Sequence, residues 1–145
     1  MNVLFLTMLD INSIDERGIY ADLLSEFVKN EHNVFILSPL ERRKKTKSKI
    51  IKKKNITIIK VKTLNLQKTS LIEKGLGQLL LGNQFLNKIR KTLSSIKFDL
   101  VLFSTPPITF SNVVYFIKKR DNAFAYLLLK DIFPQNAVDL KMIKK

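Results

Sequence analysis

The stretch "FDLVLFSTPPITFSNVVYFIKK", residues 98–119, decides the fold. Its first part, 98–104, is a short apolar run with the length of a buried β-strand. A polar turn stiffened by two prolines follows, and residues 109–119 then read as a helix. A strand that leads through a turn into a helix is the repeating unit of a βαβ wind. The stretch therefore predicts a parallel sheet.

The same alternation continues toward both ends of the chain. Strands are predicted over 2–9, 33–38, 56–62, 98–104 and 123–129, and helices over 17–30, 71–96, 109–119 and 135–143. The unbroken apolar runs of the first, second and last strands are typical of strands that are buried in a sheet. The third alternates as an edge strand does. Pro39 is expected to end the second strand, and the long helix is expected to break near Gly75, Gly77 or Gly82.

These elements predict an α/β fold: a Rossmann-like, doubly wound, mostly parallel sheet with helices on both faces. A right-handed wind places the predicted strands in the order third, second, first, fourth, fifth. In such sheets a ligand binds beyond the carboxyl ends of the strands, where the order reverses. The candidate site therefore lies among the loops 9–18, 104–108 and 130–137.

Length and composition narrow the class of protein. A chain of 145 residues with 46% hydrophobic residues suits one globular domain. It has no cysteine and one histidine, which excludes disulfides, thiolate metal sites and histidine clusters. No apolar run reaches the roughly 18–20 residues of a membrane span, and the first residues lack the marks of a signal peptide. We expect a reducing, cytoplasmic setting and no metal.

The charge is strongly positive. Lys and Arg number 26 against 12 Asp and Glu, a formal net charge of +14. The basic segment, residues 41–55, is expected to be a mobile loop that contacts an anionic membrane or another polyanion. Its cations are Arg42, Arg43, Lys44, Lys45, Lys47, Lys49, Lys52, Lys53 and Lys54. Near anionic lipid each contributes about 1 kcal/mol. A compositional bias toward lysine, asparagine and isoleucine is the other explanation for the excess.

The first loop carries two candidate cleft-lining residues, Asp10 and Gly18. Gly18 stands at the start of a predicted helix, where free amides favour anions and a missing side chain lets a ligand approach. Close packing of the helix is the alternative reason for this glycine. The loop has no G-x-G-x-x-G pattern, which argues against a Rossmann-type oxidoreductase that binds NAD.

Four further candidates follow the last two strands. Ser104 and Thr105 offer hydroxyls that the neighbouring prolines would hold in the crevice, although ordinary turn chemistry also explains them. Lys130 and Asp131 follow the last strand, and the carboxylate could hydrogen-bond a substrate hydroxyl. An ion pair between the two is the structural alternative.

Two other features of the sequence bear on function. His32 lies between the first helix and the second strand, at the end of the sheet away from the crevice, and is expected to be a turn residue. No Ser-His-Asp set or carboxylate pair is present, so no catalytic residue is assigned. The predicted helix 71–96 has a broad apolar face that suits a bilayer, a partner or the core. Its large apolar residues include Leu76, Leu79, Leu80, Leu81, Phe85, Leu86 and Ile89.

Three stretches together resemble the N-terminal domain of a GT-B fold glycosyltransferase of family 4, of the bacterial capsule and O-antigen type. They are "RGIYADLLSEFVKNEHNVFILSP", "FDLVLFSTPPITF" and "LLLKDIFPQNAVDL". The chain departs from that family in having Arg17-Gly18 where a glycine pair is usual. It also has Ser104-Thr105 where many members have a histidine.

The resemblance implies that residues 1–145 bind a lipid-linked or polysaccharide acceptor at the cytoplasmic membrane face. It also implies that a C-terminal domain with a Glu-x7-Glu motif binds the nucleotide-sugar donor, with retention at the anomeric carbon. This chain has no such motif, so no cofactor is expected in it and alone it should be nearly inactive. A separate donor-binding chain is one possible partner. The alternative is a non-catalytic basic module that contacts nucleic acid or an anionic membrane.

Overall fold

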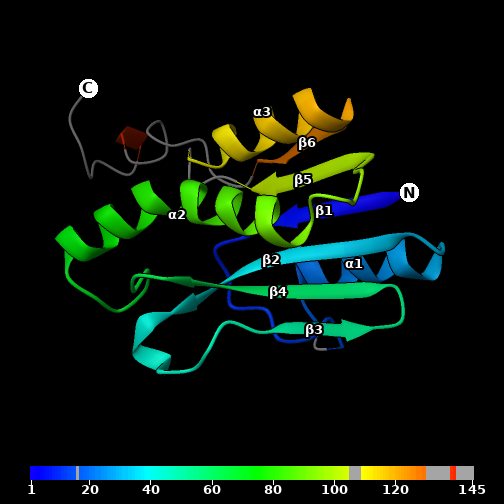
Figure 1. Cartoon of the computed structure of the whole chain (residues 1–145). Helices are drawn as coiled ribbons and strands as arrows, with labels where there is room; N and C mark the ends of the chain where they lie inside the picture. The colour runs from blue at the N-terminus through cyan, green and yellow to red at the C-terminus, as the bar shows by residue number, and fades with distance from the viewer. Residues whose placement is uncertain (16, 105–108, 130–137, 140–145) are drawn as a thin grey trace.

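The computed structural model describes residues 1–15, 17–104, 109–129 and 138–139. In this part of the chain six strands form one sheet in the order β3-β4-β2-β1-β5-β6 (Figure 1). The strands are β1 (Asn2–Leu6), β2 (Asn33–Glu41), β3 (Ile50–Lys53), β4 (Ile56–Thr63), β5 (Leu100–Ser104) and β6 (Phe124–Leu128). All neighbours are parallel except β3 and β4. The doubly wound α/β class and the order of the five predicted strands are confirmed.

Helices cover both faces of the sheet. They are α1 (Ile19–Lys29), α2 (Leu71–Thr92) and α3 (Phe110–Asp121), with a short 3-10 helix, η1 (Arg42–Lys44). In Figure 1, α1 lies behind the sheet and α2 in front of it. Residues 138 and 139 are helical, and the rest of the helix predicted over 135–143 lies outside the described residues.

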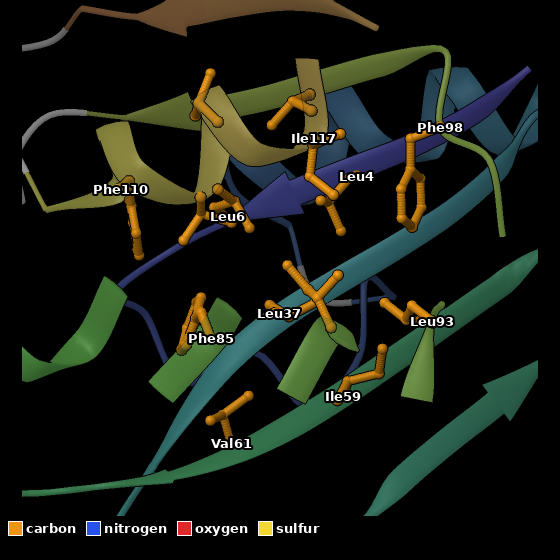
Figure 2. Close-up of a cluster of buried hydrophobic side chains, with 14 of the residues drawn as sticks. Leu4, Leu6, Leu37, Ile59, Val61, Phe85, Leu93, Phe98, Phe110 and Ile117 are labelled. Atoms are coloured by element: carbon orange, nitrogen blue, oxygen red, sulfur yellow. The ribbon is translucent and has the colours of Figure 1, made fainter. Parts of the chain in front are cut away.

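The two faces of the sheet bury two separate cores. Side chains alternate along a strand, so Leu4 and Leu6 of β1 point toward α2 and α3, while Val3 and Phe5 point toward α1. Figure 2 shows the first core, in which Leu37, Ile59, Phe85 and Phe110 also meet. This alternation decides on which face each polar residue of the strands lies.

The basic segment is not a mobile loop throughout, and that prediction was wrong. Residues 42–44 form η1, and Ile50–Lys53 form β3, which pairs antiparallel with β4. Ile50 lies opposite Ile59, and Ile51 lies opposite Ile58, so apolar cross-strand pairs hold the strand. Consequently β3 is the edge strand and β4 is an interior one, contrary to the pattern of its sequence.

Pro39 does not end β2, which continues to Glu41. The Leu37 carbonyl accepts a hydrogen bond from the amide of Thr7 at 3.3 Å, so the backbone groups of residue 37 face β1. Since these groups alternate along a strand, the nitrogen of Pro39 faces the same side. There β1 has already ended at Leu6, and no partner needs the N–H that proline lacks.

Helix α2 is unbroken, and two of its glycines, Gly77 and Gly82, allow close packing instead. A Cβ on Gly82 would lie 2.3 Å from the carbonyl oxygen of Thr109, and one on Gly77 would lie 2.9 Å from the Leu66 side chain. A Cβ on Gly75 would meet nothing within 4 Å. Gly82 therefore allows the start of α3 to rest directly on α2.

Strand β6 is far less buried than its apolar sequence predicts. Phe124 is 80% exposed and Tyr126 is 60% exposed. The reason is its position at the side of the sheet: among the described residues, β6 pairs only with β5, and Leu128 is its one side chain that packs against the core beneath α1. Strand β1 is also shorter than predicted, because the chain leaves the sheet after Leu6.

Candidate functional site

Four polar residues form a row across the sheet at the level where β1 and β5 end. We call Thr7, Ser38, Lys60 and Ser104 the polar row. Ser38 pairs in register with Lys60, and Leu6 pairs with both Leu37 and Phe103. The residue that follows each of these therefore lies at the same level: Thr7 just beyond β1, Ser38 on β2 and Ser104 on β5. All four side chains are buried, with at most 6% exposed.

The polar row lies on the face of the sheet that α1 covers. Each member follows by two residues an apolar side chain of the core beneath α1, as Ser38 follows Ile36 and Lys60 follows Ile58. The apolar pattern of that face therefore changes to a polar one toward the carboxyl ends of four adjacent strands. This is the edge where doubly wound sheets bind ligands.

Lys60 is the most unusual member, because its side chain is completely buried. Its Nζ forms an ion pair with Oδ1 of Asp10 and lies 3.2 Å from Oγ of Ser38. Burial lowers the pKa of Lys60, and the neighbouring Asp10 carboxylate offsets only part of that effect. A lysine ammonium that is buried away from solvent needs such a carboxylate and hydroxyl to compensate for its lost hydration.

The polar row also holds the loop that follows β1. Thr7 Oγ1 accepts a hydrogen bond from the amide of Leu9 at 3.0 Å. The Ser38 hydroxyl donates to the Leu9 carbonyl at 2.8 Å and accepts from the amide of Ile11 at 2.9 Å. Since Asp10 binds Lys60, three successive loop residues are fixed to side chains of the sheet.

Asp10 lies between two ammonium groups, those of Lys60 and Lys44. Partial burial raises the pKa of this carboxyl, but the hydrogen bonds and charges of the two lysines outweigh it, so the net pKa is lowered. Asp10 is therefore ionised at neutral pH, and its oxygens can accept hydrogen bonds but cannot donate them.

A cavity of about 320 Å³ opens beside this loop, lined by residues 9–13 and 17–21. Asp10 and Gly18 both belong to its wall, so the structure brings these two candidates together. Gly18 precedes α1 in an extended conformation, and nothing lies within 4 Å of a Cβ built on it. Neither backbone strain nor helix packing therefore requires glycine at this position. The space around Gly18 leaves room beside the first turn of α1.

The other cleft candidates have different outcomes. Ser104 ends β5 at the same edge, within the polar row, but it is not part of the wall of that cavity. Thr105, Lys130 and Asp131 lie outside the described residues. His32 is in the turn between α1 and β2, at the amino-terminal ends of the parallel strands. Its Nδ1 lies 3.5 Å from the N-terminal nitrogen.

The cations of the basic segment fall into two groups. Four have carboxylate partners: Arg42 pairs with Glu73, Arg43 with Glu41, Lys44 with Asp10 and Lys53 with Asp15. The remaining five are exposed and have no carboxylate partner among the described residues: Lys45, Lys47, Lys49, Lys52 and Lys54. The unpaired charge thus gathers on β3 and the loops at its two ends.

Sequence reasoning missed Thr7, Ser38 and Lys60. One signal was available for the lysine. In "ITIIKVK", residues 56–62, Lys60 occupies the alternating position of Ile56 and Ile58, which point inward. A lysine on the inward face of a strand needs a buried partner, and this need could have drawn attention to it.

Neither a metal cluster nor a membrane span is found within the residues that the structure describes. No group of three His, Cys, Asp or Glu residues there could hold a metal ion. Over the same residues, no helix combines the length and the apolar character that crossing a bilayer requires.

The fold is similar to that of a solved E. coli structure described as trehalose-6-phosphate bound with UDP-2-fluoro glucose. The TM-score is 0.58 at 11% sequence identity, and the match covers 88% of this chain and 32% of that one. The described part of the chain is a Rossmann-like α/β fold that is similar to a GT-B glycosyltransferase domain. This chain spans about a third of the length of the solved chain. At such low sequence identity, the similarity shows the fold alone. No family model and no curated protein match the sequence.

Proposed function

We propose that residues 1–145 are the acceptor-binding domain of a family 4 glycosyltransferase of the capsule and O-antigen type. Such an enzyme moves a sugar from a nucleotide-sugar to a lipid-linked or polysaccharide acceptor in cell-surface polysaccharide synthesis. The main support is the GT-B domain fold over 88% of the chain, together with a cavity at the carboxyl edge of the sheet. The solved structure of similar fold holds UDP-2-fluoro glucose, a nucleotide-sugar, which favours that class of donor.

The acceptor would lie in the cavity beside residues 9–13. There the ionised carboxylate of Asp10 can accept hydrogen bonds from sugar hydroxyls. One acceptor hydroxyl attacks the anomeric carbon of the donor, the bond from that carbon to the diphosphate oxygen breaks, and the hydroxyl proton passes to the departing diphosphate. The charge on the departing nucleoside diphosphate needs cationic or N–H groups. We place those groups on a separate donor-binding domain or chain.

A membrane location is supported by the first turns of α2. Five large apolar side chains there are exposed, namely Leu71, Ile72, Leu76, Leu79 and Leu80. Arg43 of η1 donates hydrogen bonds to the carbonyls of Gln67 and Lys68, so the basic segment adjoins this apolar face. An apolar helix face beside a group of cations suits the inner, anionic face of a cell membrane.

Vesicle binding tests this location. We expect the chain to bind vesicles of anionic phospholipid more tightly than zwitterionic vesicles or duplex DNA at the same salt concentration. Leu76→Ser combined with Leu79→Ser should weaken vesicle binding by about ten-fold or more, because two leucines no longer enter the bilayer. Phe124→Ser removes an even more exposed apolar side chain from β6 and should not change vesicle binding.

Two results would contradict the membrane proposal. An equal loss of vesicle affinity in the leucine variant and in Phe124→Ser would show that non-specific hydrophobic adsorption causes the binding. Tighter binding to duplex DNA than to vesicles would favour the nucleic-acid module instead.

A further inference from the structure

A groove with a basic lining lies between α2 and α3, on the face of the sheet opposite the polar row. Its volume is about 510 Å³, larger than the cavity beside residues 9–13. We call it the α2/α3 groove. Its walls are Asn83, Leu86, Arg90, Asn112, Tyr115, Phe116, Lys119 and Arg120.

The two helices are tied together at both ends of the groove. At one end Gly82 lets the backbone of Thr109 rest on α2, and the Thr109 hydroxyl donates to the carbonyl of Gln78 at 2.8 Å. At the other end Arg120 donates to the carbonyls of Leu93 and Ile96, at 3.4 and 2.8 Å. The walls between these ties are residues spaced three or four apart, which form one face of each helix. The groove is therefore a fixed feature of the fold.

Positive charge converges inside the groove. The guanidinium carbon of Arg90 lies 4.9 Å from the ring centroid of Phe116, and that of Arg120 lies 5.6 Å from the same centroid. Arg120 is neutralised by Asp121, with nitrogen–oxygen distances of 2.6 Å. Arg90 and Lys119 have no carboxylate partner in the described part of the chain. Two guanidinium groups thus share one ring, and only that of Arg120 is paired with a carboxylate, so Arg90 and Lys119 can bind an external anion.

The other wall residues suit a sugar. Tyr115 is 68% exposed, so its ring is free to cover the apolar face of a pyranose. Asn83 and Asn112, which are also exposed, each offer an amide that both donates and accepts hydrogen bonds, as sugar hydroxyls require. Guanidinium groups bind carboxylate and phosphate oxygens through paired N–H donors.

We propose that the α2/α3 groove binds an anionic carbohydrate, a sugar unit that carries a carboxylate or a phosphate. The inference goes beyond the proposed function, because it needs neither a donor nor a reaction and uses the opposite face of the sheet. A bound acidic glycan would be held on the protein by contacts independent of the transfer site. A nucleic acid is less suited, since one exposed aromatic side chain and two free cations do not follow a run of phosphates.

The test is titration of the ¹⁵N-labelled chain, followed by NMR at physiological salt, with trigalacturonate, glucose 6-phosphate, maltotriose and inorganic phosphate. We expect one or both acidic sugars to shift amides of residues 83–90 and 112–120, and maltotriose to leave them unchanged. Trigalacturonate and glucose 6-phosphate distinguish a carboxylate from a phosphate as the anion. Arg90→Gln should weaken binding by about ten-fold or more, because a charge-assisted hydrogen bond is lost.

Lys91→Gln is the matched control, since it removes the same charge from the next residue of α2, outside the groove wall. It should bind as the unmodified chain does. Tyr115→Ala should weaken binding of the acidic sugar but not of inorganic phosphate. Equal losses in Arg90→Gln and Lys91→Gln, or inorganic phosphate that binds as tightly as the sugars, would reduce the groove to a general basic surface. The absence of any shift with both acidic sugars would overturn the proposal.

Discussion

Asp10→Ala is expected to lower the free energy of unfolding by about 3 kcal/mol at neutral pH, as is usual when one partner of a buried ion pair is removed. The Lys60 ammonium has no exposed surface, and Asp10 is its carboxylate partner. Ser38 would remain as its hydrogen-bond acceptor, at 3.2 Å, but a hydroxyl does not balance a charge. Urea denaturation of the variant and the unmodified chain measures the difference.

Removing Lys60, the other partner of the ion pair, should lower the free energy of unfolding by less. Lys60→Met replaces the buried cation with an apolar side chain of similar length, while Asp10 keeps Lys44 and contact with water. We expect a loss below about 1.5 kcal/mol, and the double variant should be more stable than Asp10→Ala alone. If Asp10→Ala proves as stable as the unmodified chain, Lys60 is not buried with that carboxylate and the description of the polar row is wrong.

The loss of stability in Asp10→Ala, relative to the unmodified chain, should depend on pH in a definite direction. Burial lowers the pKa of Lys60 below its ordinary value of 10.5, and Asp10 partly restores it, so Asp10→Ala should lower it further. The unfolded chain then binds the Lys60 proton more tightly than the folded chain. The free energy of unfolding therefore rises with pH between the lowered pKa of Lys60 in the folded chain and its ordinary value of 10.5. The deficit of Asp10→Ala should therefore shrink between neutral pH and pH 10, as unfolding at a series of pH values would show. A constant deficit would contradict this reasoning.

Gly82→Ala and Gly75→Ala are expected to change stability in opposite directions. A Cβ at residue 82 would lie 2.3 Å from a backbone oxygen of Thr109, so the helices must separate. Such overpacking costs about 3 kcal/mol, and the better helix propensity of alanine returns about 1 kcal/mol. At residue 75 nothing lies within 4 Å, and alanine should stabilise by up to about 1 kcal/mol.

Thermal unfolding of the two glycine variants compares them directly. If both are stabilised, α2 and α3 are not in backbone contact at residue 82, and the closed end of the α2/α3 groove does not exist. If both are destabilised, alanine at residue 75 meets a neighbour that the described structure does not contain.

The order of the strands was predictable because it depends on long apolar runs and on the handedness of βαβ connections. The errors arose where a neighbour overrides a local pattern. Lysines around Ile50 and Ile51 concealed β3, whose partner is another strand of isoleucines. Pro39 looked like a strand end, but its nitrogen faces a side on which β1 has already stopped.

The candidate site was predictable only in outline. The rule for doubly wound sheets gave its edge, and Asp10 and Gly18 do line one cavity there. The polar row was missed because its members are aligned by register between strands, which the sequence does not state. Lys60 and Asp10 are 50 residues apart in the chain and meet only after folding.

NMR titration of the ¹⁵N-labelled chain tests the central claim, that sugars bind at the carboxyl edge beside Asp10. The ligands are a panel of neutral oligosaccharides, UDP-glucose and NAD. The account predicts saturable shifts of the amides of residues 9–13 and 17–21 with at least one oligosaccharide, and none there with NAD. UDP-glucose should cause no saturable shift of those amides, because the donor site belongs to a separate domain. Shifts of those amides with NAD, or with no oligosaccharide in the panel, would contradict the account.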